Sequence, residues 1–244
     1  MNVRMSLAAV VLGLAGFLPA QAQLTPDHHA CANGAGDVEP AEQERACSAV
    51  IRLGGAKENL AIAYSNRGNS LLRRDEFEKS IKHYGQAIVL DPRFANAYRN
   101  RGAAYFNLGL YDKALPDYDA AIRLEPNEAG GYADRCSARA IAGKAQEAKP
   151  DCDKAIDIDP VHTEGRAWRT LVHLQLGKIE AAEWDIVSIV GDHPDDPSLR
   201  YLWAMVLEAK GEKAEAEGQF QVARDLDAEA FAKLDKLYGR FRRR

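Results

Sequence analysis

The apolar positions between residues 98 and 122 form two stripes in which steps of three and four residues dominate. The stripes consist of Tyr98, Ala104, Tyr105 and Leu108, and of Ala114, Tyr118, Ala121 and Ile122. This spacing is typical of amphipathic helices. Gly109 lies between the stripes and breaks the first helix, and we expect the Asp112 side chain to cap the start of the second. The segment therefore predicts an antiparallel pair of helices.

The same pattern recurs with a constant period, from Tyr64 to Tyr98 and from Tyr98 to Tyr132. Tyr64-Ser65-Asn66-Arg67-Gly68 returns as Tyr98-Arg99-Asn100-Arg101-Gly102 and, weakened, as Tyr132-Ala133-Asp134-Arg135-Cys136. An acidic residue followed by proline, as in Glu125-Pro126, ends the second helix of a unit, because proline cannot continue a helix. Stacked helix pairs bury a continuous core. We expect five such units, which span residues 61–94, 95–128, 129–162, 163–196 and 197–230.

The repeated unit resembles the tetratricopeptide repeat. It has a large residue, glycine, aromatic residues, alanine and proline at fixed offsets within the period. The resemblance is good over about residues 61–196 and weaker to about residue 230. It departs from the pattern where Cys136 and Thr170 replace the glycine found at Gly68 and Gly102. The resemblance implies an all-α fold, a right-handed α-solenoid of antiparallel helix pairs. It also implies a concave groove, lined by the first helix of each unit, that accepts peptides.

Residues 1–22 have the order of a secretory signal peptide. Arg4 is followed by the uncharged run Met5–Leu18 and then by Ala20-Gln21-Ala22, a small-x-small cleavage site. The apolar run is shorter than a membrane-spanning helix requires. We therefore expect an exported protein, periplasmic or secreted, without stable insertion in a membrane.

The segments that flank the repeats are predicted to close the two ends of the solenoid. Residues 23–60 are expected to form a degenerate N-terminal hairpin, because residues 47–51 resemble residues 152–156. Residues 231–244 are expected to form a cap helix over Phe231–Phe241 with a basic tail. We favour a disordered, solvated tail over one that contacts an acidic partner or anionic lipid.

The four cysteines fall into two pairs with equal spacing. Cys31 and Cys47 are as far apart in the sequence as Cys136 and Cys152 are. An even number of cysteines in an exported chain indicates disulfides, and the equal spacing favours these two pairings, each within one hairpin. A disulfide that closes such a loop would stabilise an end unit by roughly 3 kcal/mol. Buried free thiols and, less favoured, a zinc site remain alternatives.

Charge and motifs narrow the function class. The net charge of −4 argues against nucleic acid as a partner. The sequence has no nucleophile elbow, no phosphate-binding glycine loop and no H-E-x-x-H zinc motif. His28 and His29 beside Asp27 could hold a metal, but a flexible polar start is the favoured interpretation. We therefore expect that the protein is not an enzyme and that it binds no cofactor and no metal. We expect its partner to be a protein or a peptide.

The resemblance implies which residues line the groove. The best candidates are Asn69, Arg73, Asn96, Arg99, Asn100, Phe106 and Asn107. Amide and guanidinium groups can fix a peptide backbone or a carboxylate, and an exposed phenyl ring can anchor an apolar side chain. Positions in the later units that the resemblance also assigns to the groove include Ala133, Ser137, Ala140, Ile141, Thr170, Leu174, Tyr201 and Met205.

Some members of the family clamp a C-terminal carboxylate with five basic or amide residues. Asn69 and Asn100 match that set, but Ser65, Gly130 and Asp134 stand at the other three positions. An internal peptide or a folded partner is therefore favoured. The sequence predicts a non-catalytic protein–protein interaction scaffold of the cell envelope. The alternatives are a self-associating architectural protein, which would be a homo-oligomer, and a non-catalytic accessory subunit of an envelope enzyme complex.

Overall fold

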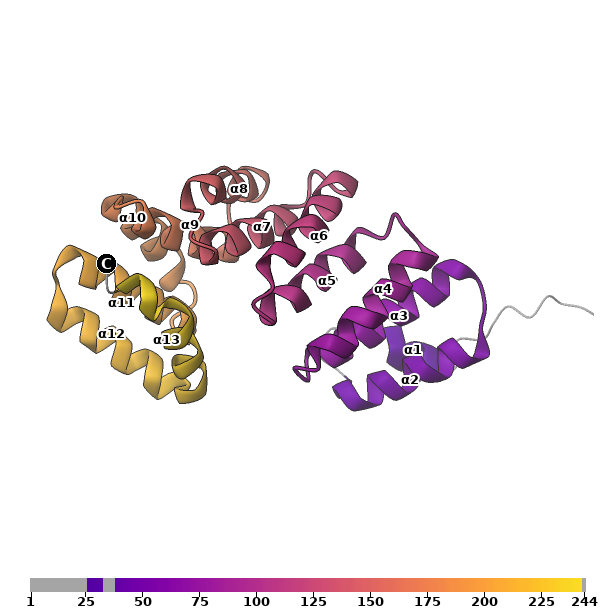
Figure 1. Ribbon diagram of the computed structural model, residues 1–244. Coiled ribbons are helices and arrows are strands. Elements are labelled where there is room, and N and C mark those ends of the chain that lie inside the picture. The colour runs from indigo at the N-terminus through magenta and orange to yellow at the C-terminus, as the bar shows by residue number, and fades with distance from the viewer. Residues whose placement is uncertain (1–25, 33–37, 243–244) are drawn as a thin grey trace, which may run out of the picture.

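Figure 1 shows the computed structural model, which describes residues 26–32 and 38–242. The predicted signal peptide, residues 1–22, lies outside the described residues, as do Arg243 and Arg244. Within the described ranges the chain forms thirteen α-helices and no strand. They are α1 (Pro26–Ala32), α2 (Pro40–Leu53), α3 (Lys57–Leu72), α4 (Phe77–Leu90), α5 (Ala95–Asn107), α6 (Tyr111–Leu124), α7 (Ala129–Ile141), α8 (Ala145–Ile158), α9 (Thr163–Gln175), α10 (Ile179–Val190), α11 (Pro197–Lys210), α12 (Lys213–Leu226) and α13 (Ala228–Arg242).

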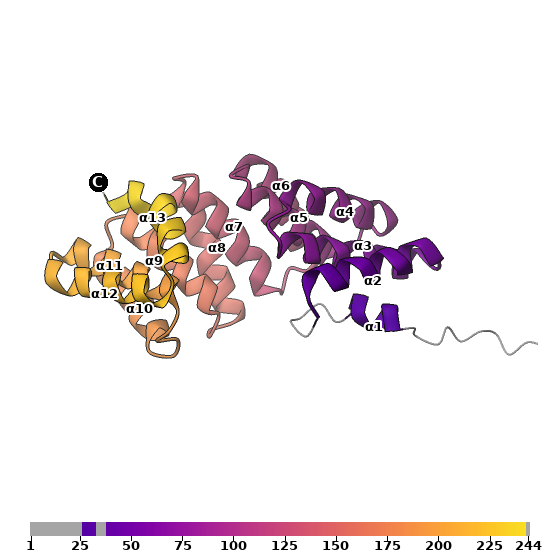
Figure 2. The same ribbon diagram turned by 90° about the horizontal axis from the view of Figure 1, so that it is seen from below.

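The helices stack as antiparallel pairs, as the sequence period predicts, in the right-handed α-solenoid that the family resemblance implies. In Figure 1 the pairs follow one another along an arch, with α6, α8 and α10 on its outer edge and α13 on its inner side. Figure 2 shows α1 and α13 at opposite ends of the stack. The first helices, α3, α5, α7, α9 and α11, therefore carry the concave face, and the second helices carry the convex face.

Close approach of two helices explains the glycines of the repeat. A Cβ atom on Gly68 would lie 2.6 Å from the Tyr84 ring, and one on Gly102 would lie 2.7 Å from the Tyr118 ring. Any larger residue would therefore push the two helices of the pair apart. The tyrosines are buried, so these contacts stand at the centre of the first two units.

Disulfides take the place of this glycine–tyrosine contact elsewhere in the chain. Cys136 and Cys152, at the equivalent positions of α7 and α8, are bonded with their Cα atoms 5.4 Å apart. Cys31 of α1 and Cys47 of α2 are bonded in the same way, with a Cα separation of 4.7 Å. Both partners of the contact therefore differ in the third unit: cysteines replace the glycine and the tyrosine, and a covalent bond replaces their packing.

Buried ion pairs add a second repeated contact, which our sequence analysis missed. The guanidiniums of Arg101, Arg135 and Arg169 each donate two hydrogen bonds to an aspartate 16 residues later, at 2.5–3.0 Å. These aspartates are Asp117, Asp151 and Asp185. The arginines of the later units also reach the preceding unit, where Arg135 binds Asp119 and Arg169 binds Asp153. We call this set of contacts the Arg–Asp ladder; it ties neighbouring helix pairs together.

Two local predictions are wrong. Asp112 does not cap α6, because the helix begins at Tyr111 with Leu110 as its N-cap residue. Asp112 lies in the first turn instead, where a carboxylate is favoured by the helix dipole. His28 and His29 belong to α1 and not to a flexible start.

The C-terminal basic residues are also not all in a solvated tail. The cap helix α13 extends to Arg242. The Arg242 guanidinium donates two hydrogen bonds of 2.9 Å to Glu208 of α11 and lies over the Phe220 ring. A bidentate arginine–carboxylate pair with aromatic stacking favours one fixed position of the side chain. Arg242 therefore helps to attach the cap helix to the fifth unit.

Candidate protein-binding site

An amide pair lies on the N-terminal part of the concave face. Asn100 of α5 donates a hydrogen bond of 2.9 Å to the side-chain oxygen of Asn69 in α3. The same oxygen accepts a hydrogen bond from the Tyr84 hydroxyl at 2.8 Å. These contacts set the orientation of the Asn69 amide. Asn100 is partly exposed, and its amide has donor and acceptor capacity beyond this one hydrogen bond.

Arg99 is held by the neighbouring unit. Its Nε atom donates a hydrogen bond of 2.6 Å to Asp134 of α7. A Cβ atom at Gly130 would lie 2.6 Å from the guanidinium carbon, so a larger residue there would displace the Arg99 guanidinium from its present position. Burial alone would lower the pKa of Arg99, but the Asp134 carboxylate outweighs it and raises the pKa. Gly130 and Asp134, the two residues that break the carboxylate-clamp pattern, are thus both used by Arg99.

The other polar candidates differ in how free they are. Arg73 donates a hydrogen bond of 2.7 Å to Gln43 and so binds the N-terminal hairpin. Asn107 donates to the Ala103 carbonyl at 2.9 Å within α5. Asn96, at the start of α5, is exposed, as is Asn107. The structure therefore gathers the amides of α3 and α5 on one face and engages the two arginines in internal contacts.

Phe106 is part of an aromatic row that crosses the concave face. Its ring lies 5.3 Å from Tyr111 and 6.2 Å from Trp168, in edge-to-face geometry. Trp168 in turn lies 6.1 Å from Tyr238 of α13. The row of Phe106, Trp168 and Tyr238 joins α5, α9 and α13. In chain order, α7 comes between the first two of these helices and α11 between the last two. Phe106 is half-buried in this row, so it offers only part of its ring to a ligand.

Most groove positions expected in the third, fourth and fifth units are buried. Ala133, Ser137, Ala140, Ile141, Thr170, Tyr201 and Met205 are each at most 5% exposed. Four of them belong to the core cluster against which Trp168 and the apolar residues of α13 pack. Most of the surface of these seven side chains is therefore inaccessible to a ligand, and the expectation that they line an open groove is wrong. Large side chains from units further along the solenoid fill the middle of the concave face.

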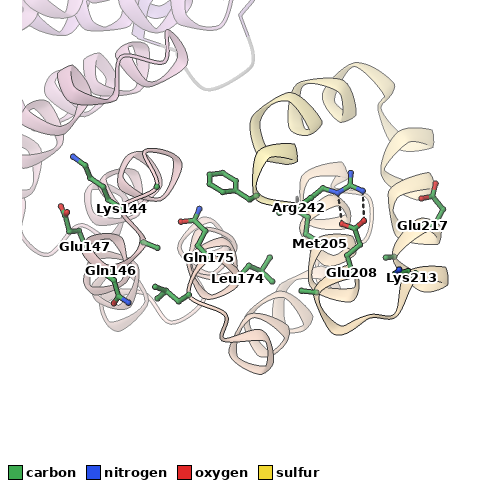
Figure 3. A pocket seen from close by; sticks show the side chains of 16 residues that line it. Lys144, Gln146, Glu147, Leu174, Gln175, Met205, Glu208, Lys213, Glu217 and Arg242 are labelled. Carbon is green, nitrogen blue, oxygen red and sulfur yellow. Dashed lines mark hydrogen bonds and ion pairs between the residues drawn. The ribbon is translucent and has the colours of Figure 1, made fainter. Parts of the chain in front are cut away.

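A pocket remains open at the C-terminal part of this face. It has a volume of about 890 Å³, which is within the range of small-molecule sites. Figure 3 shows Lys144, Gln146 and Glu147 on one side and Lys213 and Glu217 on the other. The residues that line its apolar part include Leu174, Leu176, Met205, Ala209 and Phe241.

Two groove positions predicted from the sequence, Leu174 and Met205, contribute to this pocket. The other walls come from the loops and helix starts of α8 and α12, which sequence reasoning did not assign to the site. Arg242, paired with Glu208, also lines the pocket, between these two sides (Figure 3). The repeat period alone could not reveal the pocket, because it forms where α13 turns back across α11.

The described residues hold no group of three His, Cys, Asp or Glu side chains that could bind a metal ion. Among the helices of residues 26–32 and 38–242, none is both long and apolar enough to cross a bilayer. The concave face presents amides, paired charges and partly buried aromatic rings. Such a surface can bind a peptide or a protein segment.

Comparison with known proteins supports the fold. Sequence profiles described as TPR repeat and tetratricopeptide repeat match residues 68–109, 95–128 and 169–231. No curated protein matches the sequence. Among solved structures, a tetratricopeptide repeat protein from Parabacteroides merdae ATCC 43184 is 19% identical, with a TM-score of 0.63 over 75% of this chain and 71% of that chain.

Two further structures are similar over most of their length. TTC0263, a thermophilic TPR protein in Thermus thermophilus, is 19% identical, with a TM-score of 0.61 over 74% of this chain and 96% of that one. YrrB, described as a TPR protein with an unusual peptide-binding site, is 20% identical, with a TM-score of 0.55 over 79% of this chain and 98% of that one. The repeat period, the stacked helix pairs and these matches agree: the chain belongs to the tetratricopeptide repeat family.

Proposed function

We propose that this protein is a non-catalytic scaffold of the cell envelope that binds a peptide or protein segment along its concave face. The observation that carries the proposal is the pocket of about 890 Å³ beside Leu174 and Met205. The exposed and half-exposed amides of α5 give the same face hydrogen-bonding groups that suit a peptide backbone. Protein or peptide partners are typical of the tetratricopeptide fold.

The two disulfides support a location outside the cytoplasm. Cys31–Cys47 and Cys136–Cys152 are both buried, and disulfides of this structural kind persist in oxidising compartments. With the signal-peptide pattern of residues 1–22, they support export to a periplasm or an equivalent space.

The groove can be tested by affinity capture with a variant that removes two of its amides. Asn96→Ala/Asn100→Ala takes hydrogen-bonding groups from the concave face of α5, and neither of these side chains is buried. Asn127→Ala is the matched control, since Asn127 is exposed in the loop that follows α6. Each chain is used as bait in an extracytoplasmic fraction, and retained proteins are identified by mass spectrometry. We expect a partner that wild type and Asn127→Ala retain and that the double variant loses.

The pocket has its own variant. Ala209→Trp places a large ring at an exposed residue that lines the pocket, and Ala214→Trp places the same ring at an exposed residue of α12 outside it. If Ala209→Trp loses the partner and Ala214→Trp retains it, the partner binds at the pocket. Equal retention by all four variants would contradict the proposal.

Self-association is the second candidate, and one observation favours it. Trp184, on the convex side in α10, is 74% exposed, and Val187 one turn later is 50% exposed. An exposed tryptophan is a common anchor of protein interfaces. A bait that captures only its own chain, and loses it on Trp184→Ala, would place this function first.

A further inference from the structure

The Arg–Asp ladder changes at the first helix pair. In the second, third and fourth units the ladder arginine faces an aspartate 16 residues later. In the first unit the ladder arginine is Arg67, and His83 stands at the position of the aspartate. Gly85 stands where Asp119 and Asp153 reach the arginine of the following unit. The first pair thus has the ladder cation without either of the ladder carboxylates.

The contacts around His83 show the effect of this replacement. Within the described part of the chain, the Arg67 Nε and His83 Nδ1 atoms are both buried and neither has a hydrogen-bond partner. In the three following units the equivalent arginine Nε donates to an aspartate at 2.8–3.0 Å. Arg67 turns towards α2 instead, where its Nη2 atom lies 3.3 Å from Glu44. The His83 ring stacks on Tyr64 of α3 with a centroid distance of 6.0 Å.

We propose that His83 makes the packing of α4 against α3 sensitive to pH, because its protonation places a second cation beside Arg67 at a half-buried contact. In the three following units an aspartate neutralises the arginine at this contact. Acidification therefore loosens the first helix pair, α3 and α4, before the rest of the solenoid.

The charged groups that face His83 determine the direction of the effect. Burial lowers the pKa of His83 below its usual value of 6.5, and Arg67 of α3 lowers it further. Glu44 of α2 acts in the opposite direction without reversing the shift. From α5, the Arg101 guanidinium approaches α4 beside Gly85, but both oxygens of Asp117 hold it.

The sign of the linkage follows from this lowered pKa. The folded pair favours neutral histidine, so the unfolded chain binds more protons over the interval between the two pKa values. The stability that depends on neutral His83 is complete above about pH 6.5 and is lost as the pH falls through the lower pKa of the folded state. This behaviour does not depend on what the concave face binds.

Hydrogen exchange measured by mass spectrometry on the full exported chain, without a partner, can test the proposal. Peptides from α3 and α4 are compared at about pH 7.5 and about pH 5.5, which bracket the histidine titration, after correction for the intrinsic exchange rate. We expect wild type to open more often at the lower pH, by up to about tenfold for each unit by which the two pKa values differ. Peptides from α7 and α8, where Arg135 is neutralised by aspartates, serve as the internal reference.

Two variants separate the proton from the packing. His83→Asp gives Arg67 the carboxylate of the other units, and His83→Gln keeps a polar side chain that does not titrate. We expect both to abolish the pH response of α3 and α4, and His83→Asp to slow their exchange at both pH values. If His83→Asp does not fold, His83→Gln alone decides the question. A wild type without a local pH response, or a His83→Gln variant that keeps it, would overturn the proposal.

Discussion

Replacing Cys136 and Cys152 with serine is expected to lower the free energy of unfolding by about 3 kcal/mol, because the disulfide closes a short loop between α7 and α8. Both sulfurs are fully buried at the centre of the α7–α8 pair, so the serines would also leave two polar groups in an apolar contact. Urea unfolding of the oxidised protein, followed by circular dichroism, measures the loss.

The neighbouring units supply a control for this variant. Cys136→Gly/Cys152→Tyr restores the contact that Gly68 and Gly102 make with Tyr84 and Tyr118. We expect this double variant to regain part of the lost stability, because a buried tyrosine ring fills the space that the disulfide leaves. A glycine–tyrosine variant no more stable than the double-serine variant would contradict the equivalence of the two contacts.

Removal of Asp185 is expected to cost about 3–5 kcal/mol, because Asp185→Ala leaves a largely buried arginine without its main carboxylate. The Asp185 side chain is 1% exposed and accepts hydrogen bonds of 2.8 and 2.6 Å from Arg169. His173 Nδ1 lies 3.3 Å from the same carboxylate. The urea midpoint of Asp185→Ala, compared with wild type, measures the effect.

Asp153 provides the matched comparison, because it binds the same arginine from a more exposed position. Its side chain is 35% exposed and lies 3.1 Å from Arg169. Asp153→Ala should cost less than about 1 kcal/mol, as is usual for ion pairs in contact with water. Equal losses of stability for the two variants would show that the buried Arg169–Asp185 contact stabilises the fold no more than the more exposed Arg169–Asp153 contact does.

The Arg169–Asp185 contact also depends on pH, but here the folded state favours the charged form of the side chain, whereas at His83 it favours the neutral form. Burial alone would raise the pKa of Asp185, but the nearby His173 ring and the two hydrogen bonds from Arg169 hold it below its usual value of 3.8. The ionised carboxylate is thus favoured in the folded state. Its contribution to stability is present above about pH 3.8 and is lost as the pH falls through the lower pKa of the folded chain.

Contacts within one helix pair were largely predictable from the sequence. The constant period and the two apolar stripes per unit indicated helix pairs, and the equal spacing of the cysteines indicated the pairing that the structure contains. The ladder was present in the sequence at the same spacing as the cysteines, as Arg101 and Asp117 show. It was missed because charged residues on helices usually face solvent, and spacing does not reveal burial.

The middle of the concave face could not be predicted in this way. Transfer by repeat position treats each unit alike, whereas Trp168 contacts Phe106 two units earlier and Tyr238 of α13. The small residues of α7, such as Ala133 and Ala140, become buried in this part of the fold. The pocket beside Met205 likewise depends on where α13 packs, which no feature of a single unit determines.

Site-specific photo-crosslinking in the producing cell can locate the partner-binding surface, because it does not require a known partner. A photoreactive amino acid is placed at Asn96 or Ala209 on the concave side, and at Lys82 or Lys154 on the exposed face of α4 or α8. If the concave face binds the partner, we expect a crosslinked protein from Asn96 and Ala209 and none from Lys82 and Lys154. Crosslinks from Lys82 and Lys154 alone would contradict it and would place the working surface on the convex side.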